Sequence, residues 1–212
     1  MAAARTLSVD HAPTLRAILS NDRVRWRVLG LVRSLRLPDY WIGAGFIRNA
    51  VWSHLHRRPA PCLSGDVDVL WFCPERVAGS ADKEVEAALR AMEPSVCWSV
   101  KNQARMHLRN GDPPYASTLD AMRHWPETAT AVATRLTEDG RCELAAPFGL
   151  GDLFGLILSP TPRFMGGKHH VYLDRIQSKG WLATWPLLRM DAGASCQHDD
   201  TDLNPELRLQ TR

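Results

Sequence analysis

The chain has 212 residues, of which 45% are hydrophobic and 23% are charged. This composition predicts an ordinary globular protein and excludes a wholly disordered one, because eight tryptophans and a near-average apolar share supply enough surface to bury. The formal net charge of +3 is too small to indicate by itself a dedicated nucleic-acid-binding protein.

The N-terminal half alternates predicted helices with predicted strands. Apolar residues at helical spacing, or in short β-branched and aromatic runs, distinguish the two kinds of element. The helices are expected over residues 22–36, 47–55 and 82–92, and the strands over residues 40–42, 67–72 and 96–100. Such alternation indicates an α/β fold.

The C-terminal half is predicted to be more varied. A capping box at residues 117–120 opens a short helix that Pro126 closes, and residues 128–136 and 142–144 predict a two-stranded hairpin. Helical pieces are expected over residues 153–158 and 172–176. We therefore expect one domain over residues 1–190, with a core at 22–150, a helical C-terminal extension at 150–190 and a flexible tail at 191–212.

Targeting signals and cysteine motifs are missing from the sequence. No apolar run has the length of a signal-peptide core or of a membrane-spanning helix, so we expect a cytoplasmic protein without membrane contact. The five cysteines are scattered singly with no C-x-x-C pair, which argues against a disulfide framework and against a zinc cluster.

Two aspartates, Asp66 and Asp68, stand at the start of the strand predicted over residues 67–72. Residues two apart in a strand point to the same face, with ~7 Å between their α-carbons. Two ionised carboxylates there repel each other, and a hard divalent cation such as Mg²⁺ or Mn²⁺ would neutralise them. The alternative, which is commoner for an isolated D-x-D, is that Asp66 caps a turn and Asp68 forms an edge salt bridge.

A glycine-containing turn, Gly43-Ala44-Gly45, lies between the predicted strand at residues 40–42 and the helix that follows. Such a turn lets the backbone approach a ligand, and the free N–H groups of the following helix favour an anion such as triphosphate. Joined to the later Asp-x-Asp strand, the turn resembles the pattern of the nucleotidyltransferase superfamily that includes DNA polymerase β.

Further runs resemble a bacterial nucleotidyltransferase-like family once classed as a domain of unknown function. They are Arg48-Asn49 with Trp52, residues 101–107, residues 146–154 and residues 179–181. The resemblance implies a nucleotidyltransferase fold of the α/β (α+β) class, with a small mixed sheet flanked by helices and added C-terminal helices. It also implies metal-dependent transfer of a nucleoside monophosphate group from a nucleoside triphosphate, and it leaves the acceptor open.

In that superfamily three carboxylates hold two divalent metal ions, and the resemblance assigns Asp66 and Asp68 to the first two. The strand predicted at residues 96–100 contains no acid. The third catalytic and metal-binding carboxylate is therefore predicted to be Glu143, which follows a hairpin turn as an acid does in the lincosamide-modifying transferases. The alternative is that Glu143 is an exposed strand glutamate.

Basic and amide side chains near these motifs are the predicted nucleotide contacts. A guanidinium offers phosphate a two-pronged donor and an ammonium acts as a point charge, whereas an amide can orient a base or ribose or cap local backbone. The predicted nucleotide-binding residues are Gly43, Ala44, Gly45, Arg48, Asn49, Lys101, Asn102 and Arg105. His107 could serve as a general base, although a packed histidine is the interpretation we favour.

Two rival functions come from other classes. A catalytically inactive nucleotide-binding or regulatory module is favoured by the missing third acid and by Ala44-Gly45 where a Gly-Ser turn would be usual. A metal-dependent phosphohydrolase would need a His-Asp ligand set that the sequence does not show. The expected partners are a nucleoside triphosphate and an unidentified acceptor; nucleic acid is one candidate acceptor, but the net charge does not indicate it.

Overall fold

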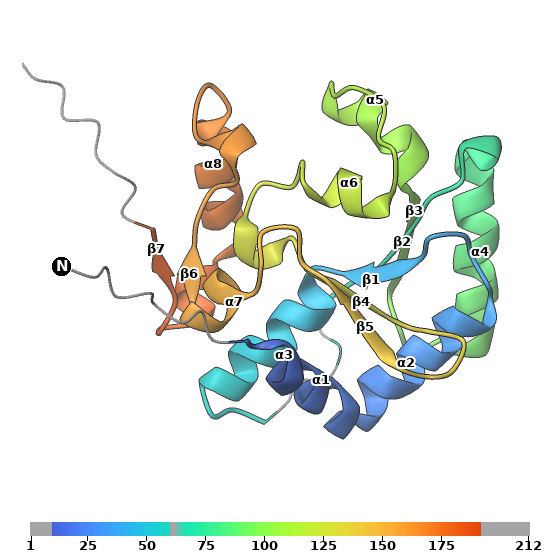
Figure 1. The fold of residues 1–212 in the computed structure, drawn as a ribbon, viewed down its shortest axis with the longest axis horizontal. Helices are drawn as coiled ribbons and strands as arrows, with labels where there is room; N and C mark the ends of the chain where they lie inside the picture. Colours follow the sequence, from blue (N-terminus) through green and yellow to red (C-terminus); the bar gives the residue numbers. More distant parts are fainter. Residues whose placement is uncertain (1–9, 60–62, 64, 192–212) are drawn as a thin grey trace, which may run out of the picture.

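The computed structural model describes residues 10–59, 63 and 65–191 (Figure 1). Its helices are α1 (Ala12–Asn21), α2 (Arg23–Ser34), α3 (Gly45–Leu55), α4 (Gly79–Met92), α5 (Met106–Asn110), α6 (Thr118–Met122), α7 (Gly151–Gly155), α8 (His169–Lys179) and α9 (Trp181–Thr184). Its strands are β1 (Trp41–Gly43), β2 (Val67–Trp71), β3 (Trp98–Asn102), β4 (Ala133–Leu136), β5 (Cys142–Ala145), β6 (Ile157–Leu158) and β7 (Arg189–Met190).

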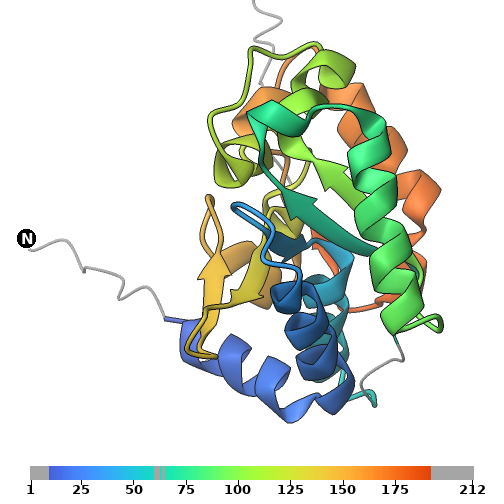
Figure 2. The same cartoon turned by 90° about the vertical axis from the view of Figure 1, so that its right-hand side faces the viewer.

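Five strands form a mixed sheet in the order β3-β2-β1-β4-β5. The strands β2 and β3 are parallel, because α4 carries the chain back between them, and the other neighbours in the sheet are antiparallel. Figure 2 shows α4 lying alongside this parallel pair. The predicted small mixed sheet flanked by helices is therefore confirmed.

The two faces of the sheet have different surroundings. One face carries Ile42, Val67 and Val69, which pack into the main core with side chains of α1, α2, α3 and α4. The opposite face carries Trp41 and Leu70, which pack with a smaller cluster that includes Met122 of α6. Asp68 lies between Val67 and Val69, so it points to the second, less covered face.

Most predicted elements are confirmed, and the corrections have local causes. The strand expected over residues 128–136 begins only at Ala133, because Thr128–Thr130 form a 3-10 turn. The helix expected over residues 153–158 ends at Gly155, and Leu156 adopts a left-handed conformation that leads into β6. Helix α1 was not predicted, because it offers the core little more than Leu15 and Leu19.

The remaining expectations concern the ends of the chain and its surroundings. Apart from Asp191, the predicted tail at residues 191–212 lies outside the described residues, and the single-domain division stays a prediction. In the described part of the chain, no helix has the length and apolar character needed to span a membrane. Cys73, Cys97 and Cys142 are free thiols there.

Candidate active site

A cavity of about 680 Å³ opens over the sheet face that carries Asp68. One of its walls is α8, and the other is formed by α5 and by the segment that follows α6 (Figure 1). The start of α3 and the strand β2 also line it. Segments from most of the chain therefore meet around one space.

Asp66 and Asp68 both line this cavity, as expected from their spacing. Burial raises the pKa of Asp68 above its usual value, and repulsion from Asp66 adds to the rise, whereas a hydrogen bond with Ser99 and the charge of Arg175 oppose it. A bound divalent cation would stabilise the charged form of this pair, so the donor chemistry fits a hard metal ion. Among the described residues, no group of three or more acidic, histidine or cysteine side chains has a metal-binding arrangement.

The turn between β1 and α3 brings backbone to the same cavity through Ala44 and Gly45. Ala44 has φ +48° and ψ −114°, and its N–H donates to the carbonyl of Val132 at 3.0 Å. Gly43 lies outside the cavity lining and has no room for a side chain, because a Cβ there would lie 2.9 Å from the Trp125 ring. The turn is thus fixed between β4 and Trp125.

Arg48 and Asn49, on the first turn of α3, line the cavity as predicted. The guanidinium of Arg48 donates to Oδ1 of Asn49 at 3.0 and 3.1 Å, and it lies 4.6 Å from the ring centre of Trp181 and 5.1 Å from that of Trp52. Burial, with a contribution from the charge of Arg175, lowers the pKa of Arg48 to about 10. Arg48 therefore remains a cation at neutral pH.

Helix α8 adds cations that were not among the predicted nucleotide contacts. Val171, Arg175 and Lys179 are spaced four residues apart, so they share one helix face, and that face lines the cavity. The Nε of Arg175 lies 2.9 Å from Oε1 of Glu127, a fully buried carboxylate that also accepts a hydrogen bond from Thr130 at 2.6 Å. Burial raises the pKa of Glu127, and Arg175 opposes this rise. The helix predicted over residues 172–176 contains Arg175, and Lys179 begins the family-like run at residues 179–181; continuation of that helix to Lys179 is the signal that could have placed both on one face.

Three nucleotide-binding residues were predicted at the end of β3 and just after it. Lys101 lines the cavity, whereas Asn102 and Arg105 do not. Asn102 is buried, and its amide holds the backbone of Cys73 and Arg76 at 2.8 to 3.1 Å, so it fastens the end of β3 to the loop after β2. Arg105 pairs with Asp82 of α4. Asn102 therefore binds backbone and Arg105 binds α4, and neither residue lines the cavity.

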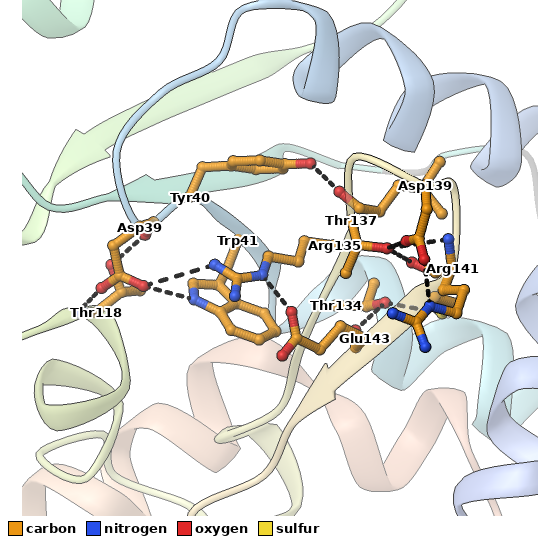
Figure 3. Close-up of polar contacts among 12 residues, drawn as sticks. Asp39, Tyr40, Trp41, Thr118, Thr134, Arg135, Thr137, Asp139, Arg141 and Glu143 are labelled. Carbon is orange, nitrogen blue, oxygen red and sulfur yellow. Dashed lines mark hydrogen bonds and ion pairs between the residues drawn. The ribbon is translucent and has the colours of Figure 1, made fainter.

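Glu143 lies on β5, three strands away from β2 in the sheet order. Neighbouring strands are ~4.8 Å apart, which gives a lateral separation of ~14 Å from the strand that carries Asp68. The Glu143 carboxylate accepts from Nε of Arg135 at 2.6 Å, and the Arg135 guanidinium lies 4.2 Å from the ring centre of Trp41 (Figure 3). The structure does not bring Glu143 to Asp66 and Asp68.

Comparisons with known proteins agree on the type of fold. A family model described as nucleotidyltransferase matches residues 30–190. An NMR structure described as revealing a CCA-adding enzyme head domain is 30% identical, with a TM-score of 0.77 over 87% of this chain and 97% of that one. No curated protein matches the sequence.

Two longer solved proteins share the fold at lower identity. A CCA-adding enzyme in complex with CTP is 15% identical, with a TM-score of 0.53 over 86% of this chain and 43% of that one. A tRNA-processing enzyme in an apo form is 13% identical, with a TM-score of 0.50 over 82% of this chain and 44% of that one. The chain thus spans less than half the length of either protein.

Proposed function

The chain belongs to the nucleotidyltransferase family, and from this premise we propose that it transfers a nucleoside monophosphate group from a nucleoside triphosphate to an acceptor hydroxyl, with a divalent cation at Asp66 and Asp68. The observation that carries the proposal is the position of these two carboxylates in one cavity with the start of α3 and the basic face of α8. The CCA-adding enzyme that binds CTP supports a nucleoside triphosphate as the substrate.

The cations of α3 and α8 at the cavity suit a triphosphate. Arg48 and Arg175 each offer a planar two-pronged donor and Lys179 adds a point charge, while Lys101 adds another from β3. The N–H groups at the start of α3 add a partial positive charge. We therefore place the triphosphate between α3 and α8, where these groups neutralise the pyrophosphate as it leaves.

The aspartates have a separate role in the proposed reaction. Held by Asp66 and Asp68, Mg²⁺ or Mn²⁺ would stabilise the charge that builds on the attacking and leaving oxygens. The charges of Arg175 and Lys179 act to lower the pKa of Asp68, which supports a phosphate site near the carboxylates. An acceptor hydroxyl would then approach from the α5 side of the cavity.

A nucleotide-binding module without catalysis is the second candidate. It is favoured by the ion pair of Glu143 with Arg135 and by the fact that, among the described residues, no third acid joins Asp66 and Asp68 in a metal-binding group. Both candidates predict metal-dependent nucleotide binding, and only the enzyme predicts transfer.

The test is incubation of the protein with each α-labelled nucleoside triphosphate, Mg²⁺ and cell extract as the source of acceptor. We expect label to move to an acceptor with the unmodified chain. Asp66→Asn and Asp68→Asn should each lower the rate ~100-fold or more, because a carboxylate that holds the cation contributes several kcal/mol.

Asp139→Asn, at an exposed hairpin turn, is the matched control and should keep the full rate. Thermal unfolding adds a second measurement: Mg²⁺ with nucleotide should raise the Tm of the unmodified protein and not that of Asp68→Asn. Undiminished transfer by both aspartate variants would overturn the assignment, and binding without transfer by the unmodified chain would favour the inactive module.

A further inference from the structure

The cavity wall opposite α8 contains a buried network of polar side chains centred on Asp112. The Asp112 side chain is only 1% exposed, although it borders the cavity. Its carboxylate pairs with Arg163 and accepts a hydrogen bond from the hydroxyl of Tyr115. Its Oδ2 also lies 3.3 Å from Nδ1 of His124, without the geometry of a hydrogen bond.

This network fixes the orientation of the His124 ring. Nδ1 is buried and faces Asp112, whereas the side chain as a whole is 23% exposed and lines the cavity. The ring of Tyr115 packs against the imidazole with 4.8 Å between ring centres. A carboxylate beside Nδ1 favours the tautomer with its proton there, which leaves a lone pair on Nε2. In the described part of the chain, Nε2 has no hydrogen-bond partner.

The neighbouring residue holds His124 close to the proposed reaction centre. The ring of Trp125 packs over Gly43, and Leu70 of β2 packs against the same position. Leu70 is on the same face of β2 as Asp68, two residues further along the strand. His124 therefore borders the cavity next to a residue that packs on β1 and β2.

We propose that His124 is the general base of this active site and that Asp112 is its positioning residue. The inference rests on the proposed function, which supplies the nucleoside triphosphate and the acceptor. It also supplies a proton acceptor to a site in which, among the described residues, no third acid joins Asp66 and Asp68 in a group that could hold a metal ion.

The proposed step balances in protons and electrons. Nε2 of His124 takes the proton of the acceptor hydroxyl as the acceptor oxygen forms a bond to the α-phosphorus. The bond from that phosphorus to the bridging oxygen breaks, and its electron pair leaves on pyrophosphate. The imidazolium, stabilised by Asp112, then gives its proton to solvent.

A small set of charged and titratable groups faces His124. Asp112 and Tyr115, from the segment after α5, contact the ring directly. Arg163 of the 3-10 turn Pro162–Phe164 acts through its pair with Asp112, and His107 of α5 reaches the site only through the Tyr115 ring. The pH dependence of transfer therefore reflects His124 together with these residues.

The test compares His124→Gln with the unmodified protein in the labelling assay, across pH 5 to 9, with nucleotide binding measured in parallel. A general base contributes ~10²- to 10⁴-fold, so we expect transfer to fall at least ~100-fold while nucleotide affinity stays within ~2-fold. With the unmodified protein the transfer rate should rise as the pH increases from 5, and this rise should be absent from the variant. Asp112→Asn should reduce the rate less than His124→Gln does. His170→Gln, at an exposed position of α8, is the control and should keep rate and profile.

Cooperative thermal unfolding with a Tm close to that of the unmodified protein confirms that each variant is folded; if His124→Gln fails this check, His124→Asn replaces it. Transfer by a folded His124 variant at the full rate, with the rise from acid pH intact, would overturn the inference and leave the proposed function standing. Loss of nucleotide binding together with transfer in folded His124 variants would also overturn it, because the residue would then act in binding. Absence of both transfer and metal-dependent nucleotide binding in the unmodified chain would overturn the proposed function and this inference with it.

Discussion

Ala44 occupies a backbone conformation that residues other than glycine rarely adopt. With φ +48° and ψ −114°, the backbone of Ala44 is strained, because the residue carries a Cβ. The strained residue lies in the turn that leads from β1 to the cavity. The turn is held by the hydrogen bond to Val132, so the surrounding structure imposes this conformation. The backbone there is therefore set before any ligand binds.

Replacing Ala44 with glycine should stabilise the protein. Relief of ~1–3 kcal/mol of strain exceeds the ~0.5–1 kcal/mol of extra chain entropy that glycine loses on folding. We expect a net gain of ~1 kcal/mol and a rise in Tm of ~2–4 °C, measured by calorimetry. Ala88→Gly, at an exposed position inside α4, should have the opposite effect by a similar amount. A fall in Tm for Ala44→Gly would contradict this account.

Glu143 is the predicted site residue whose role most needs a direct test. Its ion pair with Arg135 is partly exposed, and such pairs contribute little to stability. We expect Glu143→Gln to keep nucleotidyl transfer within ~2-fold and to change the free energy of unfolding by less than ~1 kcal/mol. A loss of transfer as deep as that of Asp68→Asn would instead show that Glu143 acts as the third carboxylate.

The sequence revealed those site residues that lie close together along the chain. Asp68 lies on β2 and Asp66 directly precedes that strand, and Ala44, Gly45 and Arg48 share a turn and the helix after it, so local spacing was sufficient to group them. Arg175 and His124 were missed because only the folded chain brings them to the cavity. Asn102 and Arg105 belong to a motif-like run, yet their side chains face Cys73 and Asp82, which no local pattern could specify.

At the scale of secondary-structure elements, α8 forms one wall of the cavity over the sheet face that carries Asp68. Its stripe of Val171, Arg175 and Lys179 faces the aspartates, and the buried carboxylate of Glu127 holds Arg175 in place. A cation fixed by a buried partner loses less freedom when it binds phosphate than a mobile surface cation does. The helix is thus well arranged to bind the triphosphate.

Arg175→Ala should weaken binding of nucleoside triphosphate ~10- to 100-fold, because a hydrogen bond to a charged group contributes ~1.5–3 kcal/mol. Tryptophan fluorescence can measure the affinity, since the Arg175 guanidinium lies 5.6 Å from the ring centre of Trp181. Arg90→Ala, an exposed arginine paired with Glu86 on α4, is the matched control and should leave the affinity unchanged. Equal affinities of the two variants would place the triphosphate elsewhere.

Elements with strong internal periodicity were predicted well, and those shaped by distant partners were not. The apolar stripes of α2 and α4 and the β-branched run of β2 encode their own structure. The short pair β6 and β7 forms only because Ile157 meets Arg189 across a long stretch of chain. Likewise, Thr128–Thr130 curl into a 3-10 turn that places Glu127 under Arg175, against the strand preference of threonine.

At the scale of the whole molecule, the family model and the cavity describe the same unit. The matched residues 30–190 include every cavity-lining residue, from Ala44 to Lys179. The near-complete overlap with the CCA-adding enzyme head domain, at 97% of that chain, indicates that this unit recurs as one piece. Its two walls are tied across the top of the cavity by the pair of Arg163 with Asp112.

The late position of α8 in the chain bears on how the protein matures during translation. The five-stranded sheet, the aspartates and the α3 turn are all synthesised before residue 169, where this helix begins. A nascent polypeptide that has not yet reached α8 therefore lacks one wall of the cavity, together with Arg175 and Lys179. The order of synthesis leaves the cavity open on that side until this helix docks.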